Sequence, residues 1–397
     1  MKKTTRWAAL TVLLGTAAAA VTLAVTTRGE AATSAKPIII GAAVDLTGAM
    51  KPFDSAALRA AQIEAKKKTV NGRPFKVIVC NTQLDKDKTK ACADSLLAKG
   101  AVALLVTCDV EYAAPSTQEF INHGMLALAP CIGTDQQGPK RFGAKGKLAF
   151  SLGSIAQDEG AAMAEYSISR KWKRAIVVKD NLLAYFQNVA DSFAQRFQQL
   201  GGKIVECESF TSFDKTIGNV ASKVSRTKAD VICFVTAFSD LPTFVSGIRS
   251  LGNKTPIINS WGGDGNYWWT KNPKVTNYYY VTYGSLYGDD PVKAVNSLVR
   301  QVKAASGGKL PATGSFVPGA DLVDALVTAI KRTKSTNGAK LATAFEHFKG
   351  LKVTSGKITY SAKVHGVTHR AWRVMLVNNN KARFLRLWVT KKDANIG

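Results

Sequence analysis

The chain has 397 residues, of which 46% are hydrophobic, and 54 lysines and arginines against 28 aspartates and glutamates give a net charge of +26. The hydrophobic content is ordinary for a globular protein, and the length exceeds that of one usual core, so two lobes are expected. The basic residues are scattered and form no single block. This argues against a nucleic-acid partner and favours attraction to an anionic cell surface.

The N-terminal segment predicts export. Lys2, Lys3 and Arg6 make a short basic start, and residues 7–27 carry no charge. That layout is typical of a secretory signal peptide. The apolar stretch is also long enough to span a bilayer, so an uncleaved N-terminal anchor is the alternative. Residues 1–35 are therefore predicted to be a signal peptide or anchor, and the protein to be secreted or extracytoplasmic and associated with the cell surface.

Short apolar runs alternate with amphipathic helical stretches from residue 38 onward. The runs are continuous and rich in Val, Ile and Leu, as in buried parallel strands: 38–44, 75–80, 102–107 and 125–129. Helices are expected between them, over 55–68, 86–99 and 114–123. Repeated strand–helix units predict a parallel sheet flanked by helices.

The same pattern begins again after residue 153 and predicts a second α/β lobe. Its expected strands are 174–179, 203–208, 230–235, 255–259 and 277–283. Its expected helices are 158–171, 183–200, 217–225 and 241–251. The fold class predicted is thus α/β, with two doubly wound parallel-sheet lobes.

The C-terminal part does not open a third lobe. Helices are expected over 291–305, 320–334 and 338–349, and short strands over 357–360, 371–377 and 384–389. The first two helices are candidates to return and cover the first sheet, so the chain is expected to pass between lobes through a hinge of several strands. The predicted division is 36–152 plus 286–335 for lobe 1, and 153–285 plus 336–397 for lobe 2.

Six cysteines in an exported chain favour disulfides over metal binding. Cys80 ends the second strand and Cys92 lies on the helix that packs back on the sheet, whereas Cys108 and Cys131 end neighbouring strands. These positions predict the bonds Cys80–Cys92 and Cys108–Cys131, with Cys207 and Cys233 left unpaired. No C-x-x-C motif is present and none of the four histidines is placed to complete a zinc site, so neither a metal nor a cofactor is expected.

Four segments, in order, resemble the type 1 periplasmic binding proteins, in the branch of branched-chain amino acid (leucine/isoleucine/valine) receptors of ABC transporters. They are IIIGAAVDLTGAM, GAVALLVTCDVEYAAPSTQEFINHGMLALAP, AIVVKDNLLAYFQNVADSFAQRFQQLGGKIV and GADLVDALVTAIKRTKSTNGAKLATAFEHFKGLKVTSGKITYSA. The resemblance covers residues 38–389. It implies a ligand cleft between two lobes, three crossovers, and delivery of a small polar solute, such as an amino acid or a related compound, to a membrane permease.

Candidate ligand-binding residues follow from the rule that ligands sit beyond the carboxyl ends of the strands in open α/β sheets. The rule selects loops at residues 47–48, 108–109, 130–134, 180–185 and 261–266, and the resemblance selects nearly the same loops. The resemblance further implies that Tyr185 and Asp264 hold the amine end of a ligand. The complete predicted set is Asp109, Cys131, Thr134, Tyr185, Phe238 and Asp264.

Each site residue also has a structural interpretation. Asp264 lies in a Gly-Gly-Asp-Gly turn, and Tyr185 fits the surface of a helix equally well. Asp109 stands where relatives often carry serine, and a carboxylate there would repel an α-carboxylate unless it points away or pairs with a lysine. The identity of the ligand is therefore left open.

The sequence contains no motif for catalysis: G-x-S-x-G, Walker and H-E-x-x-H motifs are absent, and histidine is scarce. We therefore expect no enzyme activity. The predicted function is a monomeric extracytoplasmic solute-binding protein whose partners are a small-molecule ligand and the permease of an ABC transporter. The alternative is a receptor domain that senses a ligand for signalling without transport.

Overall fold

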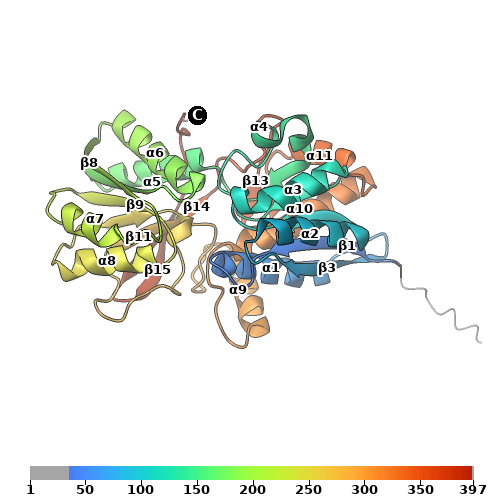
Figure 1. The fold of residues 1–397 in the computed structure, drawn as a ribbon, viewed down its shortest axis with the longest axis horizontal. Helices are drawn as coiled ribbons and strands as arrows, with labels where there is room; N and C mark the ends of the chain where they lie inside the picture. The colour runs from blue at the N-terminus through green and yellow to red at the C-terminus, as the bar shows by residue number, and fades with distance from the viewer. Residues whose placement is uncertain (1–34, 396–397) are drawn as a thin grey trace, which may run out of the picture. The chain divides into compact units, whose positions relative to one another are not determined.

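The computed structural model describes residues 35–395 (Figure 1). The predicted signal peptide or anchor lies outside the described residues, apart from its last residue. Within residues 35–395, no helix has the length and apolar character needed to cross a membrane. The described chain is built around two large sheets and one small hairpin.

The first sheet has six strands in the order β2-β3-β1-β4-β5-β6. Their bounds are β1 Ile38–Val44, β2 Thr69–Val70, β3 Arg73–Asn81, β4 Ala101–Val106, β5 Leu126–Ala129 and β6 Ala149–Ser151. All pairs are parallel except β2 with β3. The carboxyl ends of the parallel strands therefore meet at one edge, where loops and helix N-termini gather.

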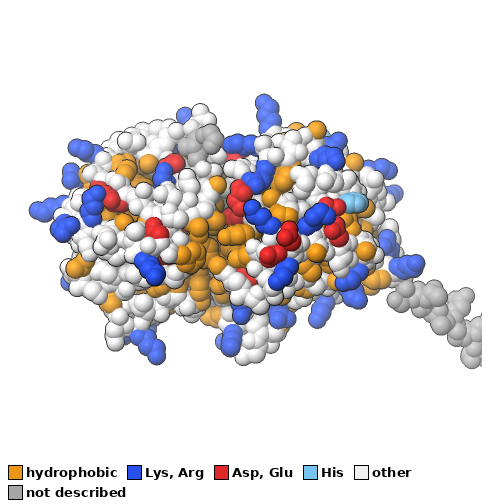
Figure 2. All heavy atoms as spheres, viewed as in Figure 1, with side chains coloured by type: hydrophobic (Ala, Val, Ile, Leu, Met, Phe, Trp, Pro, Cys, Tyr) orange, Lys and Arg blue, Asp and Glu red, His pale blue; other side chains and the backbone are white. Residues whose placement is uncertain are grey.

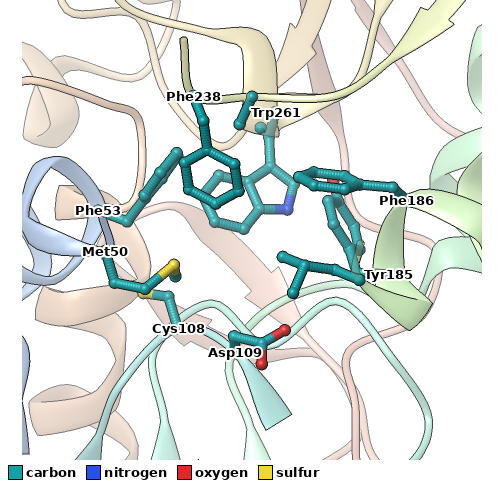
Figure 3. Close-up of a pocket in the computed structure, with 11 residues that line it drawn as sticks. Met50, Phe53, Cys108, Asp109, Tyr185, Phe186, Phe238 and Trp261 are labelled. Atoms are coloured by element: carbon teal, nitrogen blue, oxygen red, sulfur yellow. The ribbon is translucent and has the colours of Figure 1, made fainter. Parts of the chain in front are cut away.

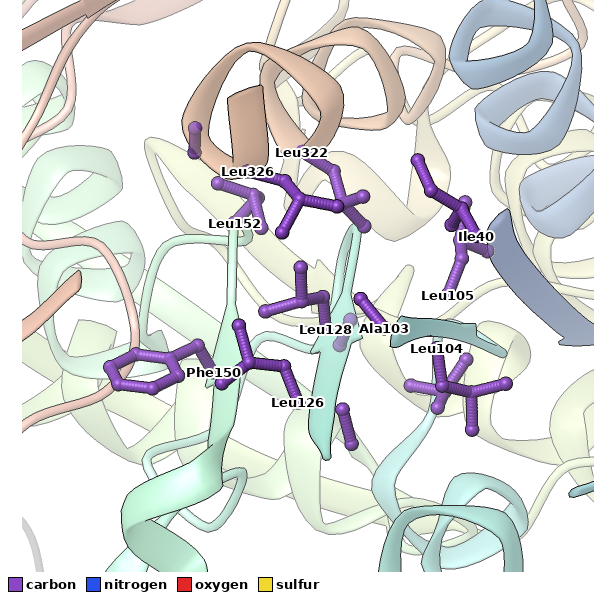
Figure 4. Close-up of a cluster of buried hydrophobic side chains, with 14 of the residues drawn as sticks. Ile40, Ala103, Leu104, Leu105, Leu126, Leu128, Phe150, Leu152, Leu322 and Leu326 are labelled. Atoms are coloured by element: carbon purple, nitrogen blue, oxygen red, sulfur yellow. The ribbon is translucent and has the colours of Figure 1, made fainter. Parts of the chain in front are cut away.

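Helices cover both faces of this sheet. They are α1 Lys51–Lys66, α2 Lys86–Ala98, α3 Val110–Asn122 and α10 Phe316–Thr333. Helices α2 and α3 pack on β1, β3, β4 and β5, and α10 packs along α1 on the other face. Figure 4 shows why both faces are buried: Leu322 and Leu326 of α10 meet Leu128 on one side of the sheet, whereas Leu104 points to the opposite side. Neighbouring residues of a strand point to opposite faces, so a continuous apolar run fits a strand that is covered twice.

The second sheet has seven strands in the order β15-β14-β11-β10-β9-β7-β8. Their bounds are β7 Arg174–Asp180, β8 Lys203–Phe210, β9 Val231–Val235, β10 Ile257–Asn259, β11 Tyr278–Thr282, β14 Trp372–Asn378 and β15 Lys381–Trp388. Five neighbouring strands of this sheet, β8, β7, β9, β10 and β11, pair in parallel. Strands β14 and β15 extend the sheet beyond β11 in antiparallel pairing. The fold class is therefore confirmed, with an antiparallel C-terminal ribbon added to the second sheet.

The two faces of the second sheet belong to two separate cores. Its helices are α5 Ala156–Ser169, α6 Ala184–Gln199, α7 Ile217–Val224 and α8 Asp240–Ser250. Val231, Cys233 and Val235 of β9 join the core formed with α5 and α6. Ile232 and Phe234 of the same strand join the core formed with α7 and α8. The alternation along one strand is the period of two expected for a pleated strand buried on both sides.

Several extended segments connect the region of the first sheet with that of the second. Residues 152–155 lead from β6 to α5, and Ser154 pairs there with Val367 in parallel orientation. The amide of Val367 donates to the carbonyl oxygen of Gly153 at 3.0 Å, and that of Ile155 donates to Val367 at 3.1 Å. These segments, residues 152–155 and 366–371, are called the crossing segments below.

One part of the C-terminal region packs differently from the predicted division, which assigned residues 336–397 to lobe 2. Helix α11 Gly338–Glu346 lies against α10 and β5, and Leu341, Phe345 and Tyr360 join the first core. The hairpin β12 Leu351–Val353 with β13 Gly356–Ile358 adjoins the same region through α10. An amphipathic pattern shows that a helix has an apolar face but not which sheet that face covers.

The remaining elements are short, apart from α9 Lys293–Ala305, which packs on α1. They are α4 Pro139–Phe142 and the 3₁₀ turns Gly143–Leu148 and Trp261–Gly263. The sequence pattern does not predict β2, β6 or β12, because runs of two or three residues carry too little periodicity to be recognised.

Candidate functional site

A pocket lies where loops from both sheets meet (Figure 3). The first region contributes Met50, Phe53, Cys108 and Asp109, and the second contributes Leu183, Tyr185, Phe186, Ala237, Phe238, Trp261 and Gly262.

Two buried aspartates shape the first-sheet side of the pocket. Asp45 follows β1, and its carboxylate accepts hydrogen bonds from the amides of Thr47, Gly48 and Met50 at 2.7–3.0 Å. Asp54 in α1 accepts from the amides of Asp45, at 2.8 Å, and Cys108, at 2.9 Å. Burial raises the pKa of Asp54 to about 7, although its hydrogen bonds lower it. These contacts fix the start of α1, and with it the two pocket residues Met50 and Phe53.

Aromatic rings form most of the pocket wall, and we call Phe53, Tyr185, Phe186, Phe238 and Trp261 the aromatic wall. The ring centroids of Phe53 and Trp261 are 5.4 Å apart with planes at 87°, an edge-to-face contact. Phe238 approaches both Phe53, at 6.2 Å, and Phe186, at 6.0 Å. Figure 3 shows these side chains converging from α1, from the N-terminus of α6 and from the loops after β9 and β10. Such rings offer apolar contact and π-faces that attract cations.

Asp109 supplies the charged group of the pocket. Its Oδ1 caps α3 by accepting from the amides of Glu111, at 2.9 Å, and Tyr112, at 3.3 Å. The residue is 4% exposed, and burial raises its pKa to about 6 against the lowering effect of the two amides. Among the described residues that line the pocket, none is lysine, arginine or histidine. The electrostatic character of the pocket is therefore negative.

A buried glutamate holds two members of the aromatic wall. The hydroxyl of Tyr185 donates to Glu159 Oε2 at 2.8 Å, and the amide of Trp261 donates to Glu159 Oε1 at 2.7 Å. Burial is the largest influence on Glu159 and raises its pKa to about 8. The indole Nε1 of Trp261 is buried and has no hydrogen-bond partner among the described residues. The pocket thus offers a free donor at Trp261 as well as the carboxylate of Asp109.

Three predicted site residues line this pocket, namely Asp109, Tyr185 and Phe238. Cys131 lies behind it, in the disulfide with Cys108, whose Cα atoms are 4.9 Å apart. The second expected disulfide, Cys80–Cys92, is also present, with Cα atoms 5.6 Å apart. Cys207 and Cys233 are free in the described part of the chain.

Asp264 and Thr134 are buried away from the pocket lining. Asp264 Oδ2 accepts from the hydroxyl of Thr282 at 2.6 Å and from the amide of Gly314 at 2.7 Å, so it braces the loop before α10. Burial raises its pKa to about 7. The hydroxyl of Thr134 is buried without a partner among the described residues. Oδ2 of Asp264 is thus occupied by donors of the protein itself, whereas its buried Oδ1 has no hydrogen-bond partner among the described residues.

Two apolar residues of the pocket lining, Met50 and Phe53, were missing from the predicted set. Met50 and Phe53 were not predicted because the first helix was expected to begin at residue 55, whereas α1 begins at Lys51 with Pro52 in its first turn. A proline followed by an apolar residue, just after the Thr47-Gly48 turn, is the signal that could have placed Phe53 at the carboxyl edge of the sheet.

A second, more open hollow adjoins the aromatic wall. It is lined by Gly48, Ala49, Lys51, Pro52, Phe213, Phe238, Ser239, Pro242, Tyr267 and Trp268. Phe238 belongs to both, and Phe213 and Tyr267 are 53% and 40% exposed. Figure 2 shows hydrophobic side chains gathered in the middle of the molecule, between areas dotted with Lys and Arg. The approach to the pocket is thus apolar.

Comparison with known proteins agrees with this architecture. The family model described as periplasmic binding protein matches residues 37–382. No curated protein matches the sequence. The branched-chain amino acid transporter substrate-binding protein LivJ of Streptococcus pneumoniae, in complex with isoleucine, is 18% identical, with a TM-score of 0.76 over 88% of this chain and 100% of that chain.

Two further solved structures are similar over the same extent. The leucine-binding protein LivK of Thermotoga maritima is 19% identical, with a TM-score of 0.76 over 89% of this chain and 99% of that one. A solute-binding protein of an ABC transporter from Rhodopseudomonas palustris, in complex with 3,4-dihydroxybenzoic acid, is 15% identical, with a TM-score of 0.75 over 90% and 98%. The resemblance found in the sequence is confirmed. The chain belongs to the periplasmic binding protein family.

Proposed function

We propose that this protein is an extracytoplasmic solute-binding protein that captures a small molecule between its lobes and delivers it to the permease of an ABC transporter. The pocket carries the proposal, because it is small, is lined from both sheets, and combines an aromatic wall with a few polar groups. Family membership supports it, as do relatives that are described as components of ABC transporters. The proposal assigns no catalytic step to the protein, which acts as a monomer.

The ligand we infer is an apolar or aromatic molecule that carries a positively charged amine and a hydrogen-bond acceptor. Asp109 pairs with the amine, and the indole N–H of Trp261 donates to the acceptor. The aromatic wall packs on the apolar body and stabilises the cation further. A carboxylate on the ligand would find no basic side chain in the described lining and would face Asp109 instead.

Export and the two-lobe division form part of the same proposal. Two disulfides fit an oxidising compartment outside the cytoplasm. The division of the lobes that we propose differs from the predicted one in residues 336–367, which join the first lobe because α11 packs on α10 and β5; the first lobe is then 36–152 plus 286–367, and the second is 153–285 plus 368–397. Closure of the lobes would be driven by ligand contacts that exist only when both lobes touch the ligand.

Thermal unfolding with matched ligands tests the proposal. Phenethylamine, phenylalanine and 3-phenylpropionate share one apolar skeleton and differ in their charged groups, so they test the charge preference of the pocket and not the acceptor near Trp261. A ligand that binds the folded state alone raises the melting temperature. We expect phenethylamine to raise it most and 3-phenylpropionate not to raise it. Stabilisation by 3-phenylpropionate but not by phenethylamine would contradict the ligand class. Absence of any response to a broad set of amines, amino acids and organic acids would contradict the binding function.

A further inference from the structure

Three side chains from distant parts of the sequence meet beside the crossing segments. Asp158 lies in the first turn of α5, His369 lies in the crossing segment 366–371, and Asp393 belongs to the C-terminal segment. Each offers one ligand atom, and these three atoms all lie within 4.8 Å of one another. The cluster is separate from the pocket described above, because the two share no residue.

Each of the two carboxylates in this cluster has one buried oxygen atom without a hydrogen-bond partner among the described residues. Asp158 is 0% exposed, and its Oδ2 accepts from the indole Nε1 of Trp372 at 3.0 Å. Its Oδ1 has no hydrogen-bond partner among the described residues, and neither does the buried Oδ1 of Asp393. Within residues 35–395 no lysine or arginine forms an ion pair with either carboxylate, and Nδ1 of His369 lies 3.9 Å from Asp393 Oδ1. A buried carboxylate in this state is costly unless a cation or a proton neutralises it.

We propose that Asp158, His369 and Asp393 bind one Zn²⁺ ion. An imidazole nitrogen with two carboxylate oxygens is a ligand set that suits Zn²⁺, which binds four ligands at about 2.0–2.2 Å. Water completes the fourth position, because the side chain of His369 is 54% exposed and the site therefore opens to solvent. Ca²⁺ requires six to eight oxygen ligands, and three residues that include an imidazole do not supply them.

The surroundings already hold the ligands close to the required geometry. Tetrahedral bonds of about 2 Å place ligand atoms about 3.3 Å apart, so separations that now reach 4.8 Å must shorten by up to about 1.5 Å. Trp372 orients Asp158 through its Oδ2. The hydroxyl of Thr390 donates to the carbonyl oxygen of Asp158 at 3.0 Å, and the amide of Ala394 donates to Gln157 at 3.1 Å. These contacts bring the C-terminal segment alongside α5.

The site also links distant parts of the chain. Bound Zn²⁺ would neutralise the two carboxylates and would join α5, a crossing segment and the C-terminal segment at one point. The ion would therefore stabilise the folded chain and hold its C-terminal segment in place, without contact with the ligand pocket.

The test uses the purified protein after treatment with EDTA. Calorimetric titration with ZnCl₂ should show one site per chain, and mass-spectrometric metal analysis after desalting should find about one Zn²⁺ per chain. His369→Ala and Asp393→Asn should weaken binding by more than about 100-fold, since even loss of an outer-shell partner costs about 10- to 100-fold. His347→Ala is the matched control, because His347 is also exposed but lies at the end of α11, and it should bind Zn²⁺ as the wild type does.

Two further measurements keep the test decisive. His369 and Asp393 are not fully buried, so their variants should fold, and circular dichroism checks this directly. Added Zn²⁺ should raise the melting temperature of the wild type and of His347→Ala, and leave His369→Ala unchanged. Retention of Zn²⁺ by folded His369→Ala at the wild-type level would overturn the proposal. Preference for Ca²⁺ over Zn²⁺, or failure of the wild type to bind Zn²⁺ stoichiometrically, would overturn it as well.

Discussion

The substitution Asp109→Asn tests the electrostatic character of the pocket with little disturbance of the fold. Oδ1 of Asp109 accepts from the amides of Glu111 and Tyr112 and so caps α3. An asparagine oxygen can accept the same two bonds, and asparagine is as good an N-cap residue as aspartate. What the variant loses is the negative charge at a residue that is only 4% exposed.

The magnitude follows from this burial. A charge-assisted hydrogen bond to an ammonium group contributes more than a neutral one, and leaving one buried charge without its partner costs about 2–4 kcal/mol. Because about 1.4 kcal/mol is a factor of ten, the affinity for phenethylamine should fall by about 30- to 700-fold. Affinity for a neutral ligand such as phenethyl alcohol should change little.

Isothermal titration calorimetry on wild type and variants provides the measurement. Glu111→Gln is the matched control, because it removes the same charge from the same helix turn. Glu111 is 52% exposed in its side chain, pairs with Arg141 at 2.6 Å and does not line the described pocket. Its removal should change affinity by less than about a factor of five, as expected for a screened surface charge. Unchanged or tighter phenethylamine binding by Asp109→Asn would refute the electrostatic reasoning.

Three further predictions concern stability. Four of the buried carboxyl groups described above, those of Asp54, Asp109, Glu159 and Asp264, have pKa values raised to about 6–8, so the folded state keeps protons that the unfolded chain loses near pH 4. The contribution of these groups to the free energy of unfolding is present at low pH and is lost as pH rises through 6–8. The melting temperature measured by calorimetry should therefore be several degrees lower at pH 8.5 than at pH 6. A higher melting temperature at pH 8.5 would contradict this prediction. Cys131→Ser removes the bond to Cys108 that closes a loop of 23 residues, and should lower the free energy of unfolding in urea by about 3 kcal/mol. Cys207 is free and exposed, so Cys207→Ser should lower it by less than about 1 kcal/mol. Gly319→Ala on α10 would press a methyl group onto the backbone of α1 and should lower the free energy of unfolding by about 1–3 kcal/mol. Gly218 on α7 faces open space, so Gly218→Ala should be neutral or stabilising. Equal effects of the two substitutions would refute the close packing of α10 on α1.

Much of the fold could be predicted because buried parallel strands leave a clear pattern. The runs at β1, β4 and β9 are continuous and apolar, since helices cover both faces of each strand. The cysteine pairs also followed from strand order, because the ends of β4 and β5 are neighbours in the sheet. The layered architecture can therefore be predicted from two kinds of evidence: the apolar pattern within each segment, and the rule that successive strands of a parallel sheet are often neighbours.

The site was only partly predictable, because its contents depend on contacts between distant residues. Asp264 was predicted to contact a ligand, and in the structure it lies outside the lining of the pocket. The hydroxyl of Thr282 and the amide of Gly314 occupy its Oδ2, whereas its Oδ1 has no partner among the described residues. Gly314 lies 50 positions further along the chain, and local sequence around Asp264 carries no sign of it. Phe53 could not be predicted for another reason. An aromatic residue in an amphipathic helix usually packs in the core, and Phe53 lies at the pocket only because α1 begins at Lys51.

The most direct measurement is a crystal structure of the protein with the ligand that stabilises it most in the thermal screen. The account predicts a ligand ammonium group within hydrogen-bond distance of Asp109 and an apolar body held between Phe53, Phe238 and Trp261, with an acceptor atom near the indole nitrogen. A ligand bound elsewhere, or one that presents a carboxylate to this pocket and leaves Asp109 without a cation, would contradict it.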